Sequence, residues 1–153
     1  MTRPSVVDHD RTTTFGLLRE AHASLERQLG AELEARAGIP YGWFEVMLRI
    51  SRAEGGLAPM SSLAEQVALT GGGITRMVDR MVAAGLVERV PCARDRRVVY
   101  AGLTEQGRAR LAGASRVHDE ALRVLLSGVS AAELAGLDEV LGQLRAARLV
   151  TTP

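Results

Sequence analysis

The sequence has little cysteine and no lysine: Cys92 is its one cysteine, and all 19 basic residues are arginine. A single cysteine excludes an internal disulfide, and no cysteine–histidine cluster has zinc spacing, so we expect no metal and no cofactor. No apolar run reaches membrane-spanning length, and the N-terminus lacks the apolar core of a signal peptide. These absences predict a soluble, cytoplasmic protein without a membrane partner.

The length of 153 residues suits one compact domain, or a subunit whose core is completed by a partner. The formal net charge is only +1, but it is unevenly distributed. Six arginines and three acidic residues lie between positions 76 and 97, which gives this segment a net charge of +3 and leaves −2 for the rest of the chain. Positive charge gathered in one segment is what local phosphate binding requires.

The stretch from residue 70 to residue 107 has the pattern of a winged helix. Apolar side chains recur on one helical face at Ile74, Val78 and Met81, and Gly85 is placed to end that helix. Short apolar segments on either side of the arginine-rich turn 91–97 predict a hairpin of two strands. Helix, strand, basic loop and return strand in this order predict double-stranded DNA as the partner.

Two motifs in this stretch resemble those of a known family. Asp95-x-Arg97, five residues and then Leu103-Thr104-x-x-Gly107 resemble the wing signature of the MarR family of bacterial transcriptional regulators, and residues 75–81 resemble its recognition helix. The resemblance extends over nearly the whole chain, 1–153, as a single subunit. It implies a mainly α fold with a small β-wing, in which a winged helix-turn-helix is flanked by N- and C-terminal dimerisation helices. It says little about the ligand.

Helical seams at both ends of the chain predict a homodimer. Apolar residues in 13–37 step by three and four, and similar stripes follow Thr104 and the capping box Ser130-x-x-Glu133. Three seams exceed what one small winged helix can bury. We therefore expect residues 13–37 and 104–149 to be dimerisation helices around a winged-helix region at 41–103.

Three glycines replace the expected side chains at the start of the recognition helix. Ser62-x-x-Glu65 predicts a capping box for the first helix of the helix-turn-helix, and Thr70 is the predicted cap of the second. In related proteins the first turn of the second helix usually presents serine, threonine or arginine; here it presents Gly71, Gly72 and Gly73. Bare amides can approach a phosphate closely, but base reading then falls to Thr75 and Arg76. We expect weaker or more shape-dependent sequence discrimination.

The wing supplies the remaining candidate contacts to DNA. Arg94, Arg96 and Arg97 are long enough to enter the minor groove, and Asp95 is expected to hold Arg97 in one rotamer. The resemblance assigns the same roles to Asp95 and Arg97. A homodimer would bring two such surfaces to a pseudo-palindromic operator. The predicted DNA-binding residues are Thr70, Gly71, Gly72, Gly73, Thr75, Arg76, Arg80, Arg94, Asp95, Arg96 and Arg97.

Two histidines lie on apolar stripes. For His118 we prefer a place in the core or the dimer seam. For His22 two interpretations stay open: a hydrogen-bonded place in the core or the dimer seam, or a cavity between the dimer helices and the winged helix. Family members often bind small aromatic or anionic effectors in such a cavity, and a cationic side chain could pair with the anion. The candidate effector-binding residues are Arg19, His22, Tyr41, Trp43 and Met47.

Cys92 is expected to be an ordinary thiol, because peroxide-sensing relatives carry their reactive cysteine in the N-terminal helix. The sequence does not support an enzyme, because no nucleophile has a base at recognisable spacing. The three glycines are not a phosphate-binding loop of an enzyme either, because such a loop follows a strand and these glycines follow a helix turn. The predicted function is a ligand-responsive transcriptional regulator, with repression expected. The alternative is a winged-helix protein-interaction module without DNA binding, which would not need three arginines at the wing tip.

Overall fold

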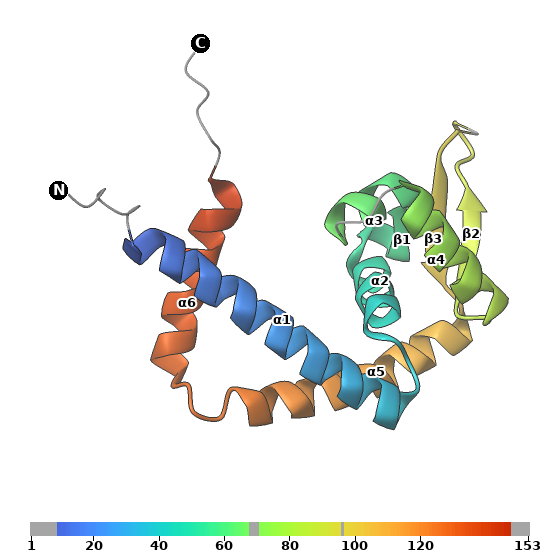
Figure 1. Ribbon diagram of the computed structural model, residues 1–153. Coiled ribbons are helices and arrows are strands. Elements are labelled where there is room, and N and C mark those ends of the chain that lie inside the picture. Colours follow the sequence, from blue (N-terminus) through green and yellow to red (C-terminus); the bar gives the residue numbers. More distant parts are fainter. Residues whose placement is uncertain (1–8, 68–70, 96, 148–153) are drawn as a thin grey trace, which may run out of the picture. The chain divides into compact units, whose positions relative to one another are not determined.

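The computed structural model describes residues 9–67, 71–95 and 97–147 (Figure 1). The chain divides into two compact units, and the division falls inside the fifth helix after Ala121. The expected fold, mainly helical with a small β-wing, is confirmed. In chain order the elements are α1 (His9–Ala37), α2 (Tyr41–Arg52), a short 3₁₀ turn η1 (Glu54–Gly56), β1 (Leu57–Pro59), α3 (Met60–Gln66), α4 (Gly71–Ala83), β2 (Val87–Pro91), β3 (Val99–Leu103), α5 (Glu105–Leu125) and α6 (Ala131–Ala146).

A three-stranded antiparallel sheet forms the wing and its base, with β3 between β1 and β2. Ala58, Ala101 and Arg89 are in register across the three strands, so their side chains share one face of the sheet. Ala58 and Ala101 are buried, which identifies this face as the one that packs on the core. Arg89 therefore extends from the edge strand on the same side as the helices.

The core of the winged helix joins α2, α3, α4 and the sheet. Buried side chains come from one stripe of each helix, and the predicted apolar face of α4 lies in this core. Among the described helices, none combines the length and apolar character needed to cross a membrane. The largest fully buried side chains are Phe44, Leu33, Ile39, Met47, Ile50, Leu63, Ile74 and Met81.

Gly85 ends α4 as predicted, in the left-handed conformation with φ of 72°. The amide of Leu86 donates to the carbonyl of Met81 at 3.0 Å, which closes the helix end. Thr104 then ties this end to the start of α5, because its hydroxyl donates to the Gly85 carbonyl at 2.6 Å and accepts from the Gly107 amide at 2.9 Å. The predicted cap at Thr104 is confirmed, and the same residue connects two helices.

Gly107 lies directly on the backbone of the α4–β2 turn. A Cβ placed on it would come within 1.9 Å of the Leu86 carbonyl oxygen, a distance that no side chain can occupy. The glycine of the Leu103-Thr104-x-x-Gly107 motif is therefore required by the close approach of α5 to this turn. The motif holds the wing hairpin and α5 together rather than contacting a ligand.

Some predicted boundaries were wrong. The helix α1 begins at His9 rather than near residue 13, and α6 ends at Ala146 rather than at 149. The helix α3 begins at Met60 after Pro59, so Ser62 lies inside it and caps nothing. Proline already has the φ that a helix entry needs, and the N-cap lies at Pro59, three residues upstream of Ser62. The capping box at Ser130 is confirmed by its reciprocal hydrogen bonds with Glu133, and Thr70 lies outside the described residues.

Candidate nucleic-acid interface

The exposed face of α4 carries the predicted base-reading side chains. Thr75, Arg76 and Arg80 are exposed on it, while the opposite face is buried. Thr75 donates its hydroxyl hydrogen to the Gly71 carbonyl, one turn back, at 2.8 Å. Its oxygen remains an acceptor, which suits the amino groups of adenine and cytosine in the major groove. Thr75 can thus only accept a hydrogen bond from a base, whereas a freely rotating hydroxyl could also donate one.

The turn between β2 and β3 presents Arg97 in a fixed conformation. The Asp95 carboxylate accepts from the Arg97 backbone amide at 3.0 Å and from its Nε at 3.3 Å. The side chain of Arg97 is nevertheless 92% exposed, so its terminal amino groups are available to DNA. The predicted Asp95–Arg97 pair is confirmed. Arg94 is exposed in the same turn, and Arg96 lies outside the described residues.

An ion pair that sequence reasoning missed connects the recognition helix to the wing. Arg89 on β2 donates to Asp79 on α4 at 2.7 Å, and the same nitrogen lies 3.5 Å from the Thr75 carbonyl oxygen. Figure 1 shows α4 beside the β2–β3 hairpin. The pair braces the two DNA-facing elements against each other and also neutralises the one carboxylate on α4, which would otherwise repel phosphate. The sequence indicated no specific role for Arg89, which was counted only among the six arginines between positions 76 and 97.

The five candidate effector residues do not share one environment. Met47 is 0% exposed in the core, so it does not line an open cavity of the subunit. Tyr41 and Trp43 are half-buried against the core, and Arg19 is exposed. The His22 side chain is 76% exposed, so it does not lie in the core of the subunit; a place in a dimer seam stays a prediction.

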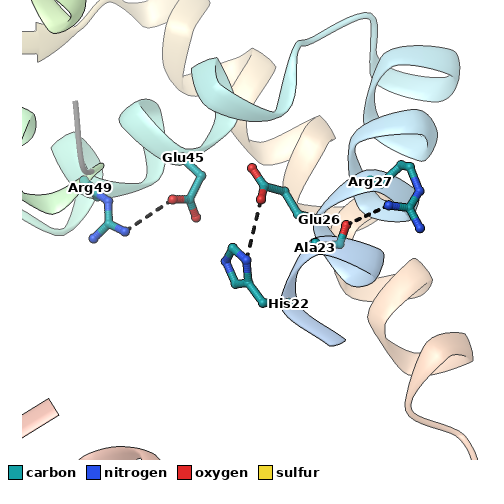
Figure 2. Close-up of polar contacts among 6 residues, drawn as sticks. All are labelled: His22, Ala23, Glu26, Arg27, Glu45 and Arg49. Atoms are coloured by element: carbon teal, nitrogen blue, oxygen red, sulfur yellow. Dashed lines mark hydrogen bonds and ion pairs between the residues drawn. The ribbon is translucent and has the colours of Figure 1, made fainter. Parts of the chain in front are cut away.

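Acidic side chains surround the space between α1 and α2 where an anionic effector was expected. Figure 2 shows His22 facing Glu26 on α1, at 3.7 Å, and Glu45 paired with Arg49 on α2, at 3.3 Å. Burial first, and then the charges of Glu45 and Glu26, raise the pKa of Tyr41. The two carboxylates oppose a negatively charged ligand beside Tyr41.

His118 is partly buried and packs its ring against the core residue Phe44. Its side chain is 16% exposed, and its ring centroid lies 4.7 Å from that of Phe44 and 6.5 Å from that of Tyr41. It connects α5 to α2 by ring packing. No group of three or more acidic, histidine or cysteine side chains within the described ranges could hold a metal ion.

We expect Cys92 to ionise more readily than a free cysteine and still to be dispensable for DNA binding. Hydrogen bonds from the backbone amides of Arg94 and Asp95, and then from the Tyr100 side chain, lower the pKa of its thiol. The rate of alkylation by iodoacetamide should therefore reach half its maximum at a lower pH in the folded protein than in the urea-unfolded chain. Cys92→Ser should bind DNA with unchanged affinity, since the thiol does not lie among the exposed arginines of α4. Peroxide-induced release of DNA that disappears in this variant would contradict the expectation.

Comparison with known proteins gives the same family from three directions. The family model described as MarR family matches residues 37–98, which span α2, the helix-turn-helix and most of the wing. A Bacillus subtilis (strain 168) protein, the uncharacterized HTH-type transcriptional regulator YdgJ, is 26% identical over 121 residues, covering 79% of this chain and 73% of its own.

Solved structures of similar proteins agree over almost the whole chain. AbsC, a MarR family transcriptional regulator from Streptomyces coelicolor, superimposes with a TM-score of 0.79 at 26% identity over 95% of this chain and 100% of its own. A cysteine-to-serine mutant of MarR from E. coli, complexed with operator DNA, superimposes with a TM-score of 0.78 at 25% identity over 92% of this chain and 99% of its own. In sequence over residues 37–98, and in fold over almost its whole length, this chain is similar to the MarR family of transcriptional regulators.

Proposed function

We propose that this protein is a repressor that binds a pseudo-palindromic double-stranded DNA operator as a homodimer and is released by a small-molecule effector. The observation that carries the proposal is the wing: Arg97 is held by Asp95 yet exposes its terminal amino groups, beside a recognition helix that exposes Arg76 and Arg80. The MarR mutant solved with operator DNA has the same fold. The proposal assigns no catalytic activity.

Exposed apolar side chains support the homodimer. Phe15, Leu17 and Leu18 on α1 are exposed, as are several apolar side chains of α6. Exposed apolar side chains repeated along a helix are typical of an interface with another chain. In the proposal, residues 13–37 and 104–149 pair with a second copy, while 41–103 contacts DNA. Two recognition helices then lie about one helical turn of DNA apart.

A protein-docking module is the competing function. It uses the same fold but does not require free guanidinium groups on both α4 and the wing. A gel-shift measurement at low salt with random-sequence duplex separates the two, since arginine–phosphate contacts bind duplex DNA without regard to sequence. Absence of any shift at micromolar protein would favour the docking module.

Arg97 and Arg76 should contribute to DNA binding in different ways. Arg97→Ala should weaken binding by roughly five- to tenfold on every sequence and reduce the salt dependence by about one phosphate equivalent per subunit, because it removes a backbone contact. Arg76→Ala should instead change the preferred sequence, because it faces the base edges. Titrations at several salt concentrations, followed by selection from a randomised duplex pool, measure both effects.

Arg123→Ala provides the control for these variants, because Arg123 is an exposed arginine in the last turn of α5, outside the proposed DNA-binding surface of α4 and the wing. It should bind like the parent protein. If Arg97→Ala and Arg76→Ala also behave like the parent, the assigned DNA face is wrong.

A further inference from the structure

An open hollow of about 530 Å³ lies between the C-terminal end of α1 and the middle of α5. Its charged lining consists of Arg36, Arg110, Arg116 and Glu120, and Gly113 and Val117 contribute uncharged surface. Three guanidinium groups and one carboxylate give this lining a formal charge of +2. On α5, residues 110, 113, 117 and 120 form one helical stripe, which faces away from the side on which His118 packs against Phe44.

The single carboxylate of the hollow is already paired. Arg36 donates to Glu120 at 2.5 Å and to Glu32 at 3.5 Å. The hydrogen bond that Arg36 donates to Glu120, followed by the charge of Glu120, raises the pKa of Arg36. Glu120 therefore compensates Arg36 across the hollow. The excess positive charge belongs to Arg110 and Arg116.

These two arginines keep donors available at the floor of the hollow. Arg110 uses one terminal nitrogen on the Gly38 carbonyl, at 3.3 Å. The Arg116 terminal nitrogen lies 4.0 Å from the point where a Cβ on Gly113 would be, so its guanidinium lies over the side-chain-free part of α5. Planar guanidinium groups recognise carboxylate and phosphate oxygens through paired N–H donors.

We propose that this hollow binds a small polyanion, bearing carboxylate or phosphate groups, between Arg110 and Arg116. The proposal rests on the proposed function, because it supplies the site of the effector. Beside Tyr41, by contrast, burial first, and then the charges of Glu45 and Glu26, raise the pKa of its hydroxyl, so two carboxylates lie where the arginines of the hollow have no counterpart except Arg49. A polyanion accordingly binds at α5 and not between α1 and α2.

The hollow is connected to the winged helix through one hydrogen bond. Gly38, with φ of 62°, forms the turn between α1 and α2, and Arg110 holds its carbonyl. A bound anion competes with that carbonyl for the Arg110 donors and loosens the link between α1 and the winged helix. The anion can change DNA affinity only by the difference between its affinities for the linked and the loosened state.

Isothermal titration of the full-length protein without DNA tests the site, with citrate, inorganic phosphate and benzoate as separate probes at low ionic strength. Citrate or phosphate should bind more tightly than the monoanion benzoate, and the stronger of the two identifies the preferred acceptor group, carboxylate or phosphate. Arg116→Gln should weaken that binding at least tenfold. Arg123→Gln on the same helix and Arg94→Gln on the wing should leave it unchanged.

A second pair of variants tests whether the probe occupies the volume of the hollow over Gly113, independently of the charge of Arg116. Gly113→Leu should fill the floor of the hollow and abolish binding of the probe, whereas Gly113→Ala meets only an ordinary 4.0 Å contact and should retain it. Arg19→Ala should also retain it. Gel shifts without probe measure DNA binding by every variant, so that failure of the site is distinguished from failure of the proposed function.

Three results would overturn the proposal. The first is that none of the probes binds, and the second is that Arg94→Gln, rather than Arg116→Gln, loses binding, which would place the ions on the DNA face. The third is dissociation of Arg116→Gln into monomers at concentrations where the parent is a dimer, which would show that the hollow receives a partner subunit instead.

Discussion

Replacing Leu137 and Leu141 with glutamate should convert the protein to a monomer and lower its operator affinity at least a hundredfold. The two leucines lie on one stripe of α6 with Val140 and Leu144, and the four side chains are between 38% and 56% exposed. Charges in an apolar interface cost several kcal/mol because they must be desolvated without a partner. A monomer also loses the second half-site, whose contribution is multiplied through effective concentration.

Sedimentation velocity at micromolar concentration and a gel shift with the operator measure the two effects. Ala135→Glu combined with Gly142→Glu provides the matched control: it adds the same charge on the opposite face of α6, where both positions are exposed. This control should remain dimeric. A dimeric Leu137→Glu/Leu141→Glu variant would mean that α6 is not part of the interface.

Gly107→Ala should destabilise the protein by about 3 kcal/mol or more, at the upper end of what overpacking costs. The added methyl group would lie 1.9 Å from the Leu86 carbonyl oxygen, and the obstacle is backbone that cannot rotate away. Relief requires α5 to move from the α4–β2 turn, which also strains the two hydrogen bonds of the Thr104 hydroxyl. The melting temperature should fall by roughly 10 °C.

Gly113→Ala on the same helix is the control, because its new methyl group meets nothing closer than 4.0 Å. It should raise stability slightly, since alanine favours a helix over glycine by about 1 kcal/mol. Thermal unfolding followed by circular dichroism compares the two variants. Equal melting temperatures for Gly107→Ala and the parent would disprove the close approach of α5 to Leu86.

The features that the sequence predicted correctly depend on interactions between residues close together in the chain. The end of α4 at Gly85 and the cap at Thr104 follow from residue type and local spacing, and the Asp95–Arg97 pair joins residues two apart. The predicted cap at Ser62 failed for a local reason as well, because Pro59 offered an earlier helix start.

The features that sequence reasoning missed all join distant segments. The Asp79–Arg89 pair depends on which face of β2 meets the helices, and that face is set by strand register rather than by composition. The Arg36–Glu120 pair joins α1 to α5 across 84 positions. His22 shares the helical spacing of its apolar neighbours, yet its side chain is 76% exposed, so spacing alone did not predict its burial.

The bare first turn of α4 has a consequence for how new specificity could arise. A Cβ at Gly71 or Gly72 would meet no atom within 4 Å, so both positions accept a side chain without disturbing the fold. Substitution there would also favour the helix, because glycine is a poor helix former. A single substitution at either position therefore adds a side chain to the exposed start of α4 and favours the helix, in exchange for a bare amide that could approach a phosphate. We expect sequence preference to change most readily at these two positions, in evolution and in redesign.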